Sequence, residues 1–289
     1  MSSTGRPFRL SLTLAAAAAP DLAGAEGSAI DPRGPIARAE LAVLQDTALL
    51  VAPVLLVVFV LLAVALWRFR AGGRGAYRPD WDGSRPVEAV VWGGPALIVA
   101  AIAALVITST RALDLARPLA GRAEAMTVQV ISLDWAYLFV YPQEGIASVG
   151  VLAFPADRPL DLRMTSDATM SSFVVPALGG QVYAMAGMVT RLELAADTPV
   201  ETVGRNALYN GDGFVAQRVA VRALAPDAHA AWIETARAAA PLTPAVYAAL
   251  ASEGRPAPRL FGAVPDGFFD DVVARYASAP KAVQAPRHP

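Results

Sequence analysis

The chain has 289 residues, of which 55% are hydrophobic and only 17% are charged. Soluble domains usually carry about a quarter charged residues, so this composition indicates membrane-spanning segments. A net charge of -1 offers no basic surface for phosphates, which argues against a nucleic-acid partner. Cysteine is absent, and this excludes disulfides, thiolate metal ligands, cysteine nucleophiles and the acylated cysteine of a lipoprotein.

The N-terminus has the features of a secretory signal. Residues 1–25 begin with Arg6 and Arg9, continue as an alanine-rich apolar run and end in an Ala-Gly-Ala sequence suited to signal peptidase. We predict that this segment is a cleaved signal peptide, with an uncleaved tail as the alternative. Residues 26–46 would then form a short segment outside the membrane.

Two uncharged stretches predict a transmembrane hairpin. Residues 47–67 contain no charged side chain and, at 1.5 Å per residue, would extend about 31 Å as a helix, close to the hydrocarbon thickness of a bilayer. A second helix is predicted over residues 88–110. The connection, residues 68–87, is rich in arginine, and the positive-inside rule places it in the cytoplasm. Both ends of the hairpin then lie on the outer side, which in a bacterium is the periplasm.

The remainder of the chain predicts an all-β domain with a helical extension. Residues 111–225 contain about seven short segments of period-two alternation, separated by Pro, Gly, Asp and Asn, which is typical of a Greek-key sandwich or barrel. Residues 226–277 predict a helix, with His229 on its surface, and an aromatic-rich segment. Residues 278–289 are rich in Pro and Ala and are predicted to be disordered.

Three runs of sequence are more specific than this pattern: YRPDWDGSRPVEAVVWGGPALIV, ISLDWAYLFVYPQEGIASVGVLAFPADRPL and TSDATMSSFVVPALGGQVYAMAGMVTRLEL. They resemble subunit II of bacterial haem-copper quinol oxidases of the cytochrome o ubiquinol oxidase type, over most of the chain. The resemblance implies a copper-free, cupredoxin-like domain on the two-helix hairpin. It also implies a place in a proton-pumping respiratory complex of the inner membrane that oxidises ubiquinol and reduces oxygen to water.

The same resemblance implies where the chemistry of the complex resides. Subunit I would carry the haems, a copper and the principal ubiquinol site, so no cofactor is expected in this chain. Its expected roles are assembly, docking and, as a further candidate role, proton uptake, with subunits I, III and IV and the lipid bilayer as partners. The residues alone leave an alternative open, a membrane-anchored periplasmic β-domain that acts as a binding or assembly module.

The loss of copper ligands separates this sequence from a neighbouring family. Subunit II of cytochrome c oxidases holds a binuclear copper centre with a distant His and a Cys-x-Glu-x-Cys-x3-His-x2-Met motif, in which thiolates bridge the metals. Aligned on this motif, the present chain has Tyr209 and Gly213 at the cysteines, Gln217 at the His and Ala220 at the Met. Ser171 falls at the distant His. No metal site is therefore expected in this chain.

Glu88 opens the second predicted helix on its cytoplasmic side. The helix dipole alone would favour a carboxylate there, whereas the family resemblance marks Glu88 as a candidate at the mouth of a proton-uptake path. Further side chains are predicted to serve in packing or in an interface, and these are Trp135, Tyr137, Tyr183, Met185, Met188, Phe268 and Phe269.

Overall fold

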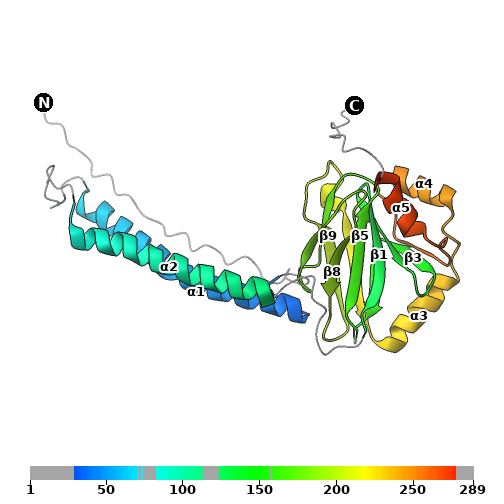
Figure 1. The fold of residues 1–289 in the computed structure, drawn as a ribbon, viewed down its shortest axis with the longest axis horizontal. Helices are drawn as coiled ribbons and strands as arrows, with labels where there is room; N and C mark the ends of the chain where they lie inside the picture. Colours follow the sequence, from blue (N-terminus) through cyan, green and yellow to red (C-terminus); the bar gives the residue numbers. More distant parts are fainter. Residues whose placement is uncertain (1–28, 71–72, 74–82, 113–123, 157, 278–289) are drawn as a thin grey trace, which may run out of the picture.

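The computed structural model describes residues 29–70, 73, 83–112, 124–156 and 158–277. Its N-terminal part is a hairpin of two long helices, α1 (Pro35–Arg68) and α2 (Arg85–Ala112), that extends away from a β-rich domain (Figure 1). Both helices are long and apolar enough to cross a membrane. The proposed signal peptide and the C-terminal tail lie outside the described residues.

Helix α1 begins at Pro35, well before the uncharged stretch that predicted it. The added residues, IARAELAVLQD, are mostly good helix formers, and proline suits the first helical turn because its missing N–H has no partner there. Hydropathy marks the membrane-embedded part of a helix and not its ends. Residues 35–46, expected as part of a separate segment, therefore continue the helix outside the apolar stretch.

The β-domain is a sandwich of two sheets. One sheet has the order β11-β3-β2-β1-β5-β8 and the other has the order β4-β10-β9-β6-β7. The strands are β1 Met126–Leu133, β2 Ala136–Tyr141, β3 Ile146–Val149, β4 Val151–Pro155, β5 Leu160–Ser166, β6 Ser171–Val174, β7 Gln181–Ala184, β8 Thr190–Leu194, β9 Val200–Asn206, β10 Arg218–Leu224 and β11 Arg259–Phe261.

The described strands exceed the seven expected segments, and two of the differences have a clear physical reason. The alternating segment at residues 126–142 is two antiparallel strands, β1 and β2, joined at a tight turn in which Trp135 adopts a positive φ of 57°. Strand β9 alternates between buried and exposed residues, yet its inward positions include Thr202 and Gly204, so the alternation carries no apolar signal.

The core between the sheets is rich in aromatic side chains, including Tyr137, Phe139 and Phe173. Helix α3 (Pro226–Arg237) closes one end, where Trp232 packs edge-on against Tyr141. His229, on the same helix, stacks on Trp232 and is only 7% exposed. Its expected surface position is therefore wrong, because α3 turns that face toward the sandwich.

The C-terminal extension covers the outer face of the six-stranded sheet. Helices α4 (Pro244–Glu253) and α5 (Phe268–Ala277) lie together beside β1 and β3 (Figure 1). Phe268, Phe269 and Val272 form a second buried cluster with side chains of β1, β2 and β3. The extension is thus an integral layer of the domain.

Backbone contacts fasten the start of α1 to the β-domain. The N–H of Arg33 donates to the carbonyl of Ala177 at 2.7 Å, and the N–H of Asp197 donates to the carbonyl of Arg33 at 3.1 Å. The N–H of Gly180 donates to Oε1 of Glu40 at 2.8 Å. With an ion pair between Arg38 and Asp197, these contacts set the direction in which the hairpin leaves the domain.

Candidate functional site

The positions that align with copper ligands gather mainly at one end of the sandwich. Ser171 opens β6, whereas Tyr209, Gly213 and Gln217 lie in the connection between β9 and β10, which contains a short helix, η2 (Phe214–Ala216). A hydrogen bond from the N–H of Ala207 to the carbonyl of Ser172 joins this connection to β6 at 2.7 Å. Ala220 is separate, because it lies further along β10 and is exposed.

Ser171 belongs to a buried cluster of hydroxyl groups. Its Oγ lies 2.6 Å from Oγ of Ser132 and accepts a hydrogen bond from the hydroxyl of Tyr137 at 3.4 Å. All three residues are fully buried. Burial raises the pKa of Tyr137, so its phenol stays protonated and neutral. This position therefore offers hydroxyl groups in place of an imidazole.

Gln217 is held by two asparagines. Oδ1 of Asn206 accepts from the N–H groups of Ser172 and Leu208, so its Nδ2 is the donor and bonds Oε1 of Gln217 at 2.9 Å. Nδ2 of Asn210 donates to the same oxygen at 3.1 Å. Within the described residues, Nε2 of Gln217 and Oδ1 of Asn210 have no hydrogen-bond partner.

Trp135 covers the glycines of the same connection. Its indole N–H donates to the carbonyl of Asn210 at 3.3 Å. A Cβ on Gly213 would come within 2.1 Å of the ring, so the close approach of Trp135 requires glycine there. Hydroxyl groups, an amide and a glycine under an indole do not fit a copper centre. No group of three or more His, Cys, Asp or Glu side chains is placed to hold a metal in the described part of the chain.

Glu88 lies in the first turn of α2, at the end of the hairpin farthest from the β-domain (Figure 1). Its side chain is exposed, and its N–H donates to the carbonyl of Ser84 at 2.9 Å. Arg68 and Arg85 lie at the same end of the hairpin. The rest of the arginine-rich connection lies outside the described residues.

The expected packing and interface residues fall into two groups. Tyr137, Phe268 and Phe269 are buried, and Trp135 is half-buried. Tyr183 and Met188 are 47% and 53% exposed, and Met185 between them is half-buried. These three residues lie on β7 and the turn toward β8, so they present apolar side chains on the surface of the domain.

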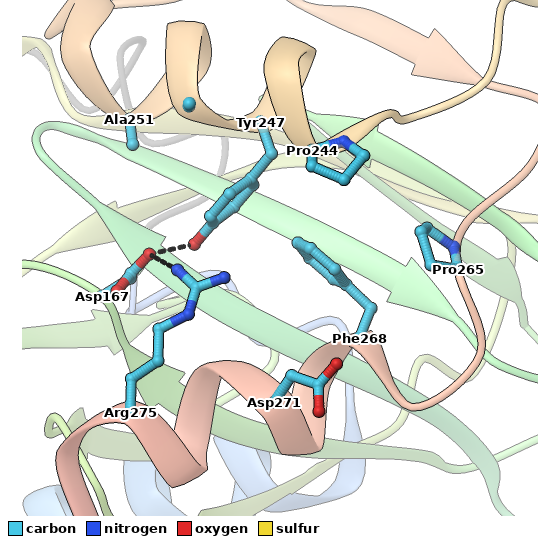
Figure 2. Close-up of a pocket in the computed structure, with 9 residues that line it drawn as sticks. Asp167, Pro244, Tyr247, Ala251, Pro265, Phe268, Asp271 and Arg275 are labelled. Carbon is cyan, nitrogen blue, oxygen red and sulfur yellow. Dashed lines mark hydrogen bonds and ion pairs between the residues drawn. The ribbon is translucent and has the colours of Figure 1, made fainter.

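Asp167, which follows β5, centres a polar cluster that the sequence patterns did not single out. Its carboxylate accepts hydrogen bonds from the hydroxyls of Tyr247 and Tyr276, the latter at 2.8 Å, and pairs with Arg275 at 3.2 Å. Figure 2 shows Asp167, Tyr247 and Arg275 at one side of a pocket of about 440 Å³ between α4 and α5. Since the tyrosines lie 80 and 109 residues away along the chain, no local motif could indicate this cluster.

Burial and Asp167 both affect the two tyrosines. Burial is the main cause that raises the pKa of Tyr247, and the hydrogen bond to the Asp167 carboxylate raises it further. The same causes, in the same order, raise the pKa of Tyr276 to about 12. Both phenols therefore remain hydrogen-bond donors through the neutral pH range, and the cluster ties the two C-terminal helices to the strand end.

Three curated relatives resemble the chain over most of its length. The cytochrome bo(3) ubiquinol oxidase subunit 2 of Pseudomonas aeruginosa is 36% identical over 274 residues, which cover 93% of this chain and 82% of the relative. The protein of the same name from Pseudomonas putida is 38% identical over 86% of this chain and 80% of its own length. The ubiquinol oxidase subunit 2 of Acetobacter aceti is 35% identical over 88% of this chain and 84% of the relative.

Other comparisons add less. No protein-family model matches the chain. The solved periplasmic domain of subunit II of the cytochrome oxidase of Bradyrhizobium japonicum is 19% identical and covers 39% of this chain and 94% of that domain, with a TM-score of 0.37. The identity and coverage of the three curated relatives, together with the two membrane helices, show that this membrane protein belongs to the ubiquinol oxidase subunit 2 family.

Proposed function

We propose that the chain is subunit II of a proton-pumping quinol oxidase in the bacterial inner membrane. The complex would oxidise ubiquinol and reduce oxygen to water, with the haems, a copper and the main quinol site in subunit I. The observation that carries this proposal is the similarity to ubiquinol oxidase subunit 2 proteins along both the hairpin and the β-domain. The arginines beside the hairpin turn support a cytoplasmic turn and a periplasmic β-domain.

Within this complex the chain would contribute assembly and docking. The described residues use their buried polar clusters, at Ser171 and at Asp167, to hold elements of the domain together. They also present exposed apolar side chains on the domain surface, including Tyr183, Met188, Tyr209 and Val215, which suit contact with other subunits. We assign these contacts to subunit I, and to subunits III and IV where the helices pack in the membrane.

Co-purification tests the proposed function. The full chain, carrying an affinity tag, is isolated from gently solubilised membranes, and haem spectra and quinol-dependent oxygen consumption are measured in the eluate. Haem and oxidase activity should elute with the chain. A chain that elutes with its normal yield but without haem would instead be a separate membrane-anchored β-domain, the alternative function.

Copper content tests the proposed lack of a metal in this subunit. Because Ser171, Tyr209, Gly213, Gln217 and Ala220 supply no thiolate, imidazole or thioether, the chain separated from the other subunits should retain no stoichiometric copper. Its spectrum should lack copper–thiolate absorption. One or more copper ions bound per chain after removal of subunit I would contradict this assignment.

A further inference from the structure

Two arginines face each other on the outer side of the five-stranded sheet. Arg205 on β9 and Arg218 on β10 are register partners, so their side chains leave the sheet on the same face. Both are exposed, and neither forms an ion pair with another described residue. Like charges directly opposite each other destabilise a sheet. A bound anion would offset that repulsion.

The same two strands contain a direct contrast. Four residues along β10, Arg222 is the register partner of Glu201, and the two form an ion pair at 3.0 Å. This strand pair therefore accommodates a carboxylate opposite an arginine. The pair Arg205 and Arg218 instead leaves two guanidinium groups available to a ligand.

The arginines line a pocket of about 320 Å³ that also has Gln217 and Val215 in its wall. Gln217 contributes a buried amide whose Nε2 has no partner among the described residues. Apolar side chains lie beside it: Val215 and Phe214 line the pocket, and the ring of Tyr209 packs against Phe214. Val215 and Tyr209 are 73% and 71% exposed. A cationic centre with an aromatic and aliphatic rim is typical of protein interfaces, and paired guanidinium groups suit a carboxylate.

The position of the β-domain favours a protein partner over lipid. Residues 35–46 of α1 precede the uncharged stretch and extend about 18 Å as a helix, whereas the polar interfacial layer of a bilayer is only about 6 Å thick on each side. The domain contacts this part of α1 at Arg38 and Glu40, so it is held beyond the lipid headgroups. Strands β8 and β9 lie on the side from which the hairpin extends (Figure 1).

The geometry points to a docking site in which Arg205 and Arg218 bind an acidic side chain on the outer surface of a neighbouring membrane subunit. This inference rests on the proposed function, because it takes the partner to be a subunit of the oxidase. The carboxylate would bridge the two guanidinium groups. Tyr209 and Val215 would be buried around it and would shield the ion pairs from water.

Carbodiimide coupling in the intact complex tests this site. Lys281 is the only lysine of the sequence, so the Lys281→Arg variant leaves this chain without a lysine side chain. In that background, Arg218→Lys places a single amine in the pocket. The carbodiimide condenses an amine with a carboxylate in contact with it into an amide, and the displaced carboxylate oxygen leaves in the urea product. Peptide mapping then identifies the partner residue.

A matched control lies on the same strand. Arg222→Lys in the same background should couple within the chain to Glu201, which shows that the reagent reaches this sheet. Arg218→Lys should produce a higher-mass species containing this chain and a second oxidase subunit, and the Lys281→Arg background alone should not. An internal product from Arg222→Lys without an intersubunit product from Arg218→Lys would overturn the proposed docking site.

A second pair of variants separates the remaining outcomes. Arg205→Gln with Arg218→Gln should lower the salt concentration at which this chain dissociates from the haem-containing subunit, whereas Arg222→Gln should not. Loss of bound phospholipid with unchanged salt resistance would assign the pocket to lipid and reject the protein partner. If haem fails to co-purify with the unmodified chain, the proposed function itself fails, and the two failures are therefore distinguishable.

Discussion

At Asp167 one carboxylate holds three side chains from a distant part of the chain. The residue follows β5, its side chain is only 8% exposed, and its partners Tyr247, Tyr276 and Arg275 all lie on α4 and α5. A buried carboxylate with these partners is stable because each oxygen accepts a hydrogen bond. The cluster is therefore a link between the β-sandwich and its C-terminal layer.

Replacing this carboxylate should loosen the C-terminal layer. Asp167→Asn keeps the size of the side chain but removes its charge, and hydrogen bonds to charged groups are worth about 2 kcal/mol each. We expect the free energy of unfolding to fall by about that amount and hydrogen exchange to accelerate in α4 and α5. Asp271→Asn is the control, because Asp271 lines the same pocket but is exposed. Equal exchange in both variants would contradict the role of Asp167.

The same cluster predicts an alkaline pH dependence. An unfolded tyrosine has a pKa of about 10, whereas Tyr276 in the folded domain has a pKa of about 12. Between these values the unfolded chain loses a proton that the folded chain retains. The stabilisation from Tyr276 is therefore fully present below pH 10 and is lost as the pH rises through about 12.

Tyr276→Phe isolates this contribution. The free energy of unfolding should fall less steeply across that pH window than in the unmodified protein, as measured by denaturant titration at several pH values. Tyr209→Phe serves as the control, because Tyr209 is exposed and makes no contact with Asp167 among the described residues. An unchanged slope in Tyr276→Phe would show that its proton is not linked to folding.

The residue scale also shows what sequence can and cannot predict about the site. The motif alignment places non-ligand residues at all five copper positions, because it needs only residue identity and spacing. The contacts that occupy those positions require the fold: Trp135 lies 75 residues before Asn210, and Ser132 lies 39 residues before Ser171. Likewise, the local sequence pattern gives no physical reason for the PALGG segment, residues 176–180, within the third of the runs quoted above.

At the scale of elements, the loop of residues 176–180 contacts the start of α1. Gly179 has a φ of +86°, and a Cβ there would lie 2.7 Å from the backbone nitrogen of Ala37. Ala37 is only 2% exposed, since the loop before β7 covers it. Gly179 therefore lets a helix backbone approach a loop backbone. This arrangement explains the sequence better than turn geometry alone does.

Gly179→Ala should weaken this junction. The positive φ costs an alanine about 1 kcal/mol, and the collision with Ala37 adds about 1–3 kcal/mol. Gly145→Ala is a matched control, because Gly145 has a φ of +69° but open space around its Cβ position. Hydrogen exchange at residues 176–180 and 195–197 should increase in the first variant only. Similar exchange in both variants would mean that strain in φ, and not contact with α1, sets the requirement for glycine.

The elements themselves were predictable where their residues are apolar. The two membrane helices and most strands follow from hydropathy and alternation. The helical start of α1, strand β9 and the buried face of α3 do not, because residues 35–46 include polar helix formers, β9 has Thr202 at an inward position, and α3 is buried through the contact of Trp232 with the distant Tyr141. Polar residues acquire their burial from partners that are distant in sequence.

At the scale of the whole molecule, the hairpin separates two regions with different environments. The β-domain is fastened to the start of α1, and Glu88 lies near the turn at the far end of the hairpin (Figure 1). In the proposed orientation Glu88 faces the cytoplasm at the edge of the bilayer, where an ionisable group costs less to place than at the centre. A carboxylate there could collect protons and deliver them to a neighbouring subunit.

Glu88→Gln tests this role in the intact complex. Glutamine keeps the size and hydrogen-bonding capacity of the side chain but cannot titrate, so subunit assembly and haem content should be unchanged. Quinol-dependent oxygen consumption per haem should fall, because proton delivery to the oxygen-reducing site would be slower. Asp82→Asn, in the connection between the two predicted membrane helices, removes an equal charge and should leave turnover unchanged. If Glu88→Gln also retained full turnover, Glu88 would be only a helix-start acid favoured by the dipole of α2.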